Sequence, residues 1–267
     1  FLGFVFIMLS SFATSAAAQS TTSTGIGQAV EARLMGKVVR LRHVLKDNSV
    51  KYDEAGNPAR MGKPGDWTLH GYFEVTTAEV RNGILWIRGN RVALSFREWE
   101  RQKMPQYVRT SEQLEIQIVL KKNGTVNLEE ELSKAFLNAT DEIPDNLPIH
   151  WHRFLCKQKQ ITKGCSTMIY TAGIRQSEGE VKDPTLTRQK QPSFTRLASQ
   201  NKLEGVVELL ILVSEHGRVL SFEVIRPLGL GLEEKAIEAV KEWEFQPATR
   251  NGAPTAIFIV VVLNFSV

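Results

Sequence analysis

The chain has 267 residues, of which 42% are hydrophobic and 23% are charged, and its formal net charge is +4. These proportions are ordinary for a globular protein, and the length allows one or two domains. The charge is uneven, because residues from Gln191 onward carry seven Lys or Arg against nine Asp or Glu, while residues 1–190 carry an excess of six positive charges. Such a weak and dispersed basic excess lacks the dense stripe that nucleic-acid binding requires, so we expect no nucleic-acid partner.

Residues 1–18 have the pattern of a secretory signal peptide. Phe1–Leu9 is an apolar stretch, residues 1–19 contain no charge, and three alanines, Ala16–Ala18, follow. An apolar core followed by small residues is typical of an exported protein, with cleavage expected after Ala18. The apolar run is shorter than the ~20 residues that a membrane span needs, but an uncleaved anchor helix is the alternative.

Residues from about 30 to 140 predict a β-rich domain. Ser20–Gly27 is small and polar, and we expect it to be a flexible N-terminus. Asn82-Gly83 and Gly89-Asn90 predict tight turns between successive strands. Asn127 is a predicted helix N-cap, with Glu130 reaching back in a variant of the capping box. Strands are expected at Lys37–Val44, Ile84–Ile87, Arg91–Phe96 and Gln113–Lys121, and Trp67–Val80 is expected to be one long strand or two short ones.

Residues 141–190 are expected to link this domain to the last part of the chain. Asp141–Pro148 carries two prolines, and Gln176–Gln191 is polar without an apolar period. Cys156 and Cys165 suit an exported protein and would close a ten-residue loop as a disulfide. That bridge would add roughly 2–3 kcal/mol through the unfolded state, and two reduced thiols are the alternative.

The sequence offers little catalytic or metal-binding chemistry. His150-x-His152 with Cys156 is the best metal candidate, but no fourth ligand follows at a standard spacing, so we predict no metal and no cofactor. No nucleophile-elbow, zincin or phosphate-loop pattern is present. We therefore expect no enzyme, and an active site assembled in space within the β-rich domain is the alternative.

The last part of the chain has a strand–strand–helix–strand pattern. Val206–Val213 is apolar at every odd position, and Arg218–Ile225 follows it after the predicted turn Ser214–Gly217. Leu232–Trp243 carries an apolar stripe at helical spacing, and its aromatic end is expected in the core. Thr255–Val267 is apolar on both faces except for Thr255, Asn264 and Ser266, which predicts a buried strand. This order predicts a small module with a helix on an antiparallel sheet, and hence an α+β fold for the whole chain.

Residues spread along this stretch, in this order and spacing, resemble the TonB C-terminal domain over residues 191–267. They are Gln191-Pro-Ser-Phe194, Ala198, Glu204-Gly205-Val206, His216-Gly217-Arg218-Val219, Ala236–Val240, Trp243-Glu-Phe-Gln-Pro247 and Gly252. The family usually has Tyr where Phe194 stands, so a hydrogen bond of that hydroxyl is lost and the packing remains.

The resemblance implies a periplasmic protein that docks an extended peptide of an outer-membrane receptor, and so a part in energy-coupled transport. In the family the last strand receives this peptide, because a sheet edge can accept another strand. The predicted partner-binding residues are Gln191, Pro192, Phe194, Ile257, Phe258, Ile259, Val260, Val261, Val262 and Leu263.

The sequence leaves two alternatives open, a scaffold that pairs with itself and a last strand that serves only as core. The chain has ten prolines and no Pro-rich spacer, which argues against force transmission across the periplasm and leaves peptide docking intact. A non-enzymatic envelope scaffold that pairs with itself as a homodimer would use the same edge. A last strand that is only core is the second alternative.

Overall fold

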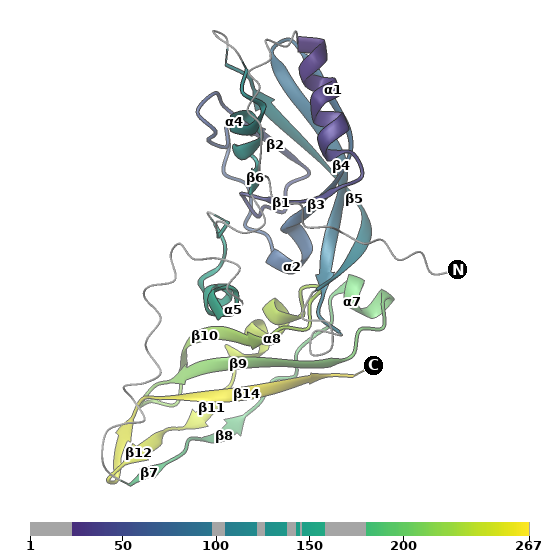
Figure 1. Cartoon of the computed structure of the whole chain (residues 1–267). Helices are drawn as coiled ribbons and strands as arrows, with labels where there is room; N and C mark the ends of the chain where they lie inside the picture. The colour runs from purple at the N-terminus through teal and green to yellow at the C-terminus, as the bar shows by residue number, and fades with distance from the viewer. Residues whose placement is uncertain are drawn as a thin grey trace.

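The structure is a computed structural model that describes residues 23–97, 105–121, 126–137, 143–144, 146–157 and 180–266. It has the predicted α+β class, with one large N-terminal sheet and smaller antiparallel sheets with helices toward the C-terminus (Figure 1). The predicted signal peptide and Cys165 lie outside the described residues.

The N-terminal sheet has six strands in the order β2-β5-β4-β3-β1-β6. Its strands pair antiparallel, except for the parallel pair β2–β5. The strands are β1 (Val38–Leu41), β2 (Ser49–Tyr52), β3 (Tyr72–Arg81), β4 (Ile84–Ser95), β5 (Gln106–Val119) and β6 (Phe136–Leu137).

Helix α1 (Ser23–Leu34) packs against β3, so the prediction of a flexible segment up to Gly27 was wrong for residues 23–27. Ile26, Val30 and Leu34 are buried at spacings of four, and they form the stripe that attaches the helix to the sheet. Three apolar residues among small polar ones give too weak a periodicity to distinguish this helix from a loop.

The predicted strand Trp67–Val80 begins as a helix instead. Helix α2 (Trp67–His70) precedes β3, and the His70 N–H donates to the carbonyl of Asp66 at 2.8 Å. The Asp66 N–H in turn donates to Nδ1 of His70 at 3.0 Å. These two local bonds stabilise one helical turn that the apolar pattern alone does not reveal.

The two predicted turns in the β3–β4 region have different outcomes. Asn82 and Gly83 have φ of 51° and 72° and form the predicted hairpin turn, which is therefore confirmed. The turn at Gly89-Asn90 was wrong, because β4 continues through it to Ser95. A Cβ on Gly89 would lie 1.9 Å from the carbonyl oxygen of Glu74, so this glycine permits a close strand approach.

Helix α4 (Leu128–Ser133) confirms the predicted cap. The Asn127 side chain accepts hydrogen bonds from the N–H groups of Glu129 and Glu130, the first at 3.1 Å. Glu130 does not reach back, because its carboxylate pairs with Lys121.

The C-terminal three-stranded sheet has the order β10-β9-β14, with β9 (Gly205–Val213) in the centre, β10 (Val219–Arg226) on one side and β14 (Ile257–Phe265) on the other. Gly217, with φ of 77°, closes the predicted turn between β9 and β10. Helix α8 (Leu232–Val240) packs against β9 and β10, and a short helix α7 (Arg196–Gln200) precedes β9. The predicted strand–strand–helix–strand order is confirmed.

The segment expected to be a polar linker contains two strands. β7 (Val181–Lys182) pairs with β12 (Ala248–Arg250), and β8 (Thr185–Arg188) pairs with β11 (Glu244–Gln246). β12 also pairs with β13 (Ala253–Thr255). Because β7 and β8 are exposed and are held by backbone pairing, they bury no apolar face that a sequence pattern could show.

One hydrophobic cluster joins the end of the N-terminal sheet to the C-terminal elements. The 3-10 helix η1 (Ile149–Trp151) and helix α5 (His152–Lys157) lie between them (Figure 1). The rings of Trp67 and Trp151 meet edge to face at 4.8 Å, and those of Phe96 and Phe154 at 5.7 Å. A second hydrophobic cluster packs helices α1 and α4 against the N-terminal sheet.

Candidate functional site

Strand β14 forms one edge of the C-terminal sheet. It pairs antiparallel with β9 over its whole length, from Ile257 opposite Val213 to Phe265 opposite Gly205. In the described part of the chain no strand pairs with the other side of β14. Its outward N–H and C=O groups are therefore available for another strand.

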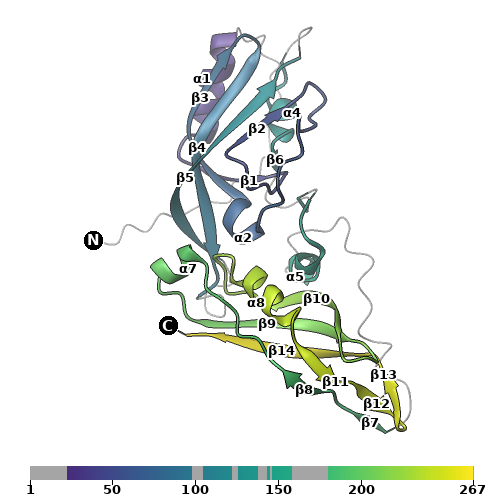
Figure 2. The same cartoon turned by 180° about the vertical axis from the view of Figure 1, so that it is seen from behind.

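The strand at the opposite edge of the same sheet, β10, packs against other elements. β10 has η1 and α5 against it, as Figure 2 also shows from behind. Arg153 of α5 donates from Nη1 to the Glu223 carboxylate of β10 at 2.7 Å. Of the two edge strands, β14 is uncharged, whereas β10 carries Glu223 and Arg226.

The side chains of β14 alternate between core and solvent. Ile257, Val261, Leu263 and Phe265 are buried, whereas Val260 and Val262 are 53% and 57% exposed. The prediction of a strand buried on both faces was therefore wrong for its outward face. Sequence alone cannot separate an apolar strand covered on both faces from one that exposes its valines.

Strand β14 lacks the devices that normally protect an edge. Natural edge strands are short, or carry charged residues or proline, to prevent pairing with other chains. β14 has nine residues and contains no charge and no proline. At about 3.3 Å per residue it offers ~30 Å of unpaired backbone.

Phe194 marks one end of this edge. Its ring meets the ring of Phe265 edge to face at a centroid distance of 5.4 Å. The next residue, Thr195, caps α7 by accepting from the Ala198 N–H and donates its own hydroxyl to the Leu230 carbonyl at 2.6 Å. The Phe194 side chain is thus held at the carboxyl end of β14.

The segment that leads to Phe194 is attached to the core by its backbone. Nε1 of the buried Trp243 donates to the Lys190 carbonyl at 2.8 Å. Gln191 is exposed and Pro192 is half-buried, directly after this anchor. Trp243 and its neighbour Phe245 lie in the core, as predicted.

The structure thus brings part of the predicted partner-binding set together. All seven residues from Ile257 to Leu263 lie on β14, and Phe194 lies at its end. The prediction did not include Phe265, although it is the residue that Phe194 contacts. The alternation of buried positions along β14 extends to Phe265 and would have identified it.

The histidine and cysteine candidates do not converge. Nε2 of His150 is 3.6 Å from the Glu234 carboxylate, whereas Nε2 of His152 is 3.3 Å from the Leu147 carbonyl. The described residues contain no cluster of three potential metal ligands. Cys156, in α5, is disulfide-bonded. Its pairing with Cys165, outside the described residues, stays a prediction.

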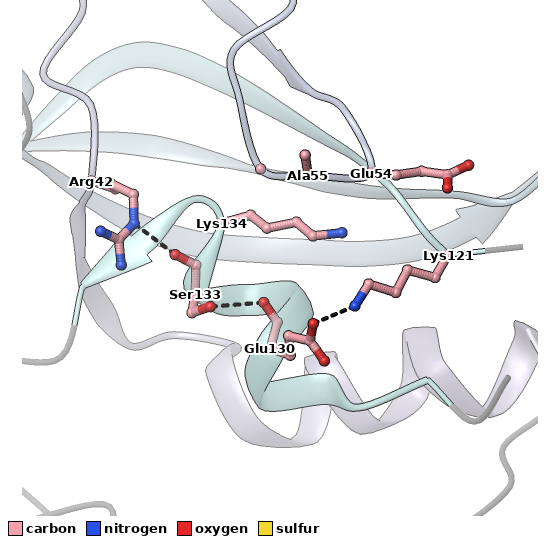
Figure 3. A pocket seen from close by; sticks show the side chains of 8 residues that line it. Arg42, Glu54, Ala55, Lys121, Glu130, Ser133 and Lys134 are labelled. Carbon is pink, nitrogen blue, oxygen red and sulfur yellow. Dashed lines mark hydrogen bonds and ion pairs between the residues drawn. The ribbon is translucent and has the colours of Figure 1, made fainter. Parts of the chain in front are cut away.

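A polar hollow of about 380 Å³ lies in the N-terminal part between the loop around Gly56 and α4 (Figure 3). Most of its charged groups have partners: Lys121 binds Glu130, Lys134 binds Glu131, and Arg42 donates from Nε to the Ser133 carbonyl at 2.7 Å. The hydrogen bond between Lys121 and Glu130 raises the pKa of Lys121 and lowers that of Glu130. Such shifts are those of a surface ion pair and give no sign of a catalytic acid or base.

Comparison with known proteins bears on the C-terminal part. Residues 190–267 match the family described as Gram-negative bacterial TonB protein C-terminal. Over 85 residues, or 32% of this chain, the sequence is 29% identical to Protein TonB of Vibrio cholerae serotype O1. The matched region spans about a third of that relative, 35% of its length.

A solution NMR structure of the Pseudomonas aeruginosa TonB CTD also aligns, at 21% identity and a TM-score of 0.27, covering 32% of this chain and 88% of that one. Among the described residues, no helix combines the length and apolarity needed to cross a membrane. Residues 190–267, which contain the open strand β14 and its neighbour Phe194, are a TonB C-terminal domain.

Proposed function

We propose that this protein is a non-enzymatic, TonB-like component of the cell envelope that docks an extended peptide from an outer-membrane receptor. The peptide adds to β14 as a fourth strand of the β10-β9-β14 sheet. Such docking requires a periplasmic protein, with residues 1–18 as its export signal. It implies a part in energy-coupled transport.

The single observation that supports this function is the unprotected edge of β14. Strand addition needs an unpaired row of backbone groups, and side-chain contacts beside that row provide selectivity. Val260 and Val262 are exposed on one face of β14, next to the position that the added strand would occupy. At one end Phe194 is half-buried against the ring of the buried Phe265, so Phe194 is the member of this pair that the peptide would meet.

A titration monitored by NMR tests the proposal on the full chain with methyl-labelled Ile, Leu and Val. A synthetic peptide from the periplasmic end of an outer-membrane receptor should shift the methyl signals of Ile257, Val260, Val262 and Leu263. Signals from β3 and β4 serve as internal controls and should stay in place. If millimolar peptide leaves the β14 signals unchanged, docking at this edge is rejected.

A matched pair of modified peptides shows whether backbone pairing causes the shifts. N-methylation of alternate residues removes the N–H groups on one edge of an extended peptide and leaves the other edge intact. Only the peptide methylated on the edge facing β14 should lose binding. Equal loss with both peptides would indicate side-chain recognition without strand addition.

The same edge supports a second function, a scaffold that pairs with itself. Two copies of β14 can align antiparallel about a two-fold axis, since such an interface places the same surface of both subunits together. The absence of charge on β14 favours this pairing as well. Sedimentation of the mature chain separates the two functions, because a tight dimer that buries β14 would compete with the peptide.

A further inference from the structure

The N-terminal sheet and the C-terminal domain meet at a buried joint. We define the joint as Thr68 of α2, Leu94 and Ser95 of β4, the loop Leu228–Gly231, and Glu233 of α8. The Leu230 N–H donates to the Leu94 carbonyl at 2.8 Å, and Ser95 forms a β-bridge with Gly229. The loop before α8 thus extends the end of β4 by backbone pairing, across more than 130 residues of sequence.

A carboxyl group lies at the centre of this joint. Glu233 is completely buried, and its carboxylate accepts from the N–H groups of Leu228 at 2.6 Å and Gly229 at 2.5 Å. The second oxygen is 3.4 Å from the Thr68 hydroxyl. That hydroxyl also accepts from the Gly231 N–H at 2.8 Å, so Thr68 of the N-terminal part binds both the loop and the carboxyl group.

The titratable group that acts directly on Glu233 is Glu234, its neighbour on the same helix. The Glu234 carboxylate accepts from Nε1 of Trp151 at 2.9 Å and lies 3.6 Å from Nε2 of His150, both on η1. From the N-terminal part, Asp66 and Lys46 form an ion pair at 3.5 Å near the start of α2. The other titratable groups close to Asp66 are Glu234 and Lys235, and those close to His70 include Arg91 and Glu234.

We propose that this joint is a proton-sensitive latch, closed while Glu233 carries a proton and loosened when its carboxyl group ionises. The closed latch fixes the C-terminal domain against the N-terminal sheet, and the loosened latch lets the two parts move relative to each other. The proposal stands whether or not β14 binds a peptide.

Burial of the carboxyl group, followed by repulsion from Glu234, raises the pKa of Glu233 from 4.5 to about 7. Hydrogen bonds from the loop N–H groups act in the opposite direction and do not offset the burial. In an open joint the carboxyl group meets water and returns toward 4.5. The closed joint therefore has its full stability below pH 4.5 and loses stability as the pH rises through about 7.

Two neighbours also titrate and must be separated from Glu233. Burial raises the pKa of Asp66, which acts in the same direction. Burial and then the charge of Arg91 lower the pKa of His70 to about 4, so His70 favours the closed state above pH 6.5 and acts in the opposite direction. The two hydrogen-bond partners of His70, Asp66 and Arg91, both belong to the N-terminal part.

Hydrogen exchange of the full chain tests the latch. The amides of Leu228–Gly231 are followed at several pH values from 5 to 8 in the wild type and in Glu233→Gln, which carries a permanently neutral group of the same shape. At each pH the exchange rate of the wild type is divided by that of Glu233→Gln, which cancels the intrinsic pH dependence of exchange. That ratio should rise roughly 70-fold from pH 5 to pH 8, as expected for one carboxyl group titrating at 4.5 in the open state and about 7 in the closed state.

Glu238→Gln is the matched control, because Glu238 lies on the same helix with its carboxylate exposed and paired to Lys235. It should exchange like the wild type at every pH. A wild-type to Glu233→Gln ratio that does not change with pH would overturn the proposal. A ratio that rises with pH supports it.

Glu234→Gln gives a second, independent test of the latch. It takes the place of the first test if Glu233→Gln does not fold. Removing the like charge should lower the pKa of Glu233, so the loop amides should begin to lose protection at a lower pH than in the wild type. The glutamine oxygen can still accept from Trp151. An unchanged pH of loosening would contradict the latch.

Discussion

The two main sheets of this protein end in different ways. The N-terminal sheet ends at β2, with four residues, and at β6, with two residues, and the stretch of β5 that β2 leaves unpaired carries Arg109 and Glu112. The C-terminal sheet ends at the nine-residue, uncharged β14. Natural proteins shorten or charge an edge that must remain unpaired, so the exception at β14 points to an edge that is used.

The two parts also differ in what fills their interiors. In the N-terminal part the buried Arg91 donates from Nη2 to the carbonyls of Leu45 at 2.8 Å and Asp47 at 2.6 Å, which fixes an irregular loop. The core between α8 and its sheet is formed by apolar side chains, Trp243 among them, and the buried carboxyl group of Glu233 lies beside it at the joint. The C-terminal domain therefore depends mainly on apolar burial, and it should respond strongly to loss of volume.

Trp243→Ala should have the largest effect. The side chain is 3% exposed, and its removal leaves a cavity and an unsatisfied Lys190 carbonyl, so the free energy of unfolding should fall by about 3–5 kcal/mol. Denaturant unfolding followed by circular dichroism measures it. Trp243→Phe keeps most of the apolar contact and should cost about 1 kcal/mol, the contribution of one hydrogen bond. Similar losses in both variants would show that volume does not dominate this core.

Thr68→Val should have the next largest effect. Valine keeps the shape but leaves the Gly231 N–H buried without its acceptor, which should cost about 1–3 kcal/mol. Thermal unfolding of the full chain gives the value. Thr68→Ser retains the hydroxyl and is the matched control, and a Ser variant as unstable as the Val variant would assign the effect to packing.

Asn127→Ala should have a smaller effect, confined to the N-terminal part. Loss of the cap leaves the first N–H groups of α4 without the Asn127 acceptor and should cost about 1 kcal/mol. Asn127→Asp should retain the cap and the stability. Exchange protection of α8 should be unchanged in both variants, and reduced protection there would show that the two parts unfold as one unit.

Elements with strong local signals were predictable from the sequence. The alternating apolar residues of β9, the stripe on α8 and the Asn82-Gly83 turn depend on short-range spacing, and the structure confirms all three. α2 and the β7–β8 segment were missed, because one turn of helix and two exposed strands leave no periodic apolar pattern.

The candidate site was predictable only in part, for a related reason. The spacing of residues 257–263 predicted a strand, and the resemblance predicted its role as a docking edge. No pattern could show that β14 exposes Val260 and Val262, because exposure depends on which other elements cover the sheet. The joint was also beyond prediction, since Thr68 and Glu233 are 165 residues apart and meet only through the fold.

The smallest effect on stability is expected from the double variant Val260→Lys and Val262→Lys, which tests the comparison between the two kinds of edge most directly. Both side chains are more than half exposed, so the unfolding free energy should change by less than about 0.5 kcal/mol. The lysines give β14 the protection that other edge strands have, and they remove apolar surface beside the added strand.

Affinity for the receptor peptide, measured by calorimetry, should therefore fall at least tenfold, or about 1.4 kcal/mol. Leu220→Lys is the matched control, because Leu220 is 61% exposed on β10, at the opposite edge of the same sheet, and it should bind the peptide like the wild type. Equal loss of affinity in the control would indicate that charge anywhere on the sheet disturbs binding. A stable double variant that binds normally would show that β14 is not the docking edge, even though it is an uncharged edge strand of nine residues.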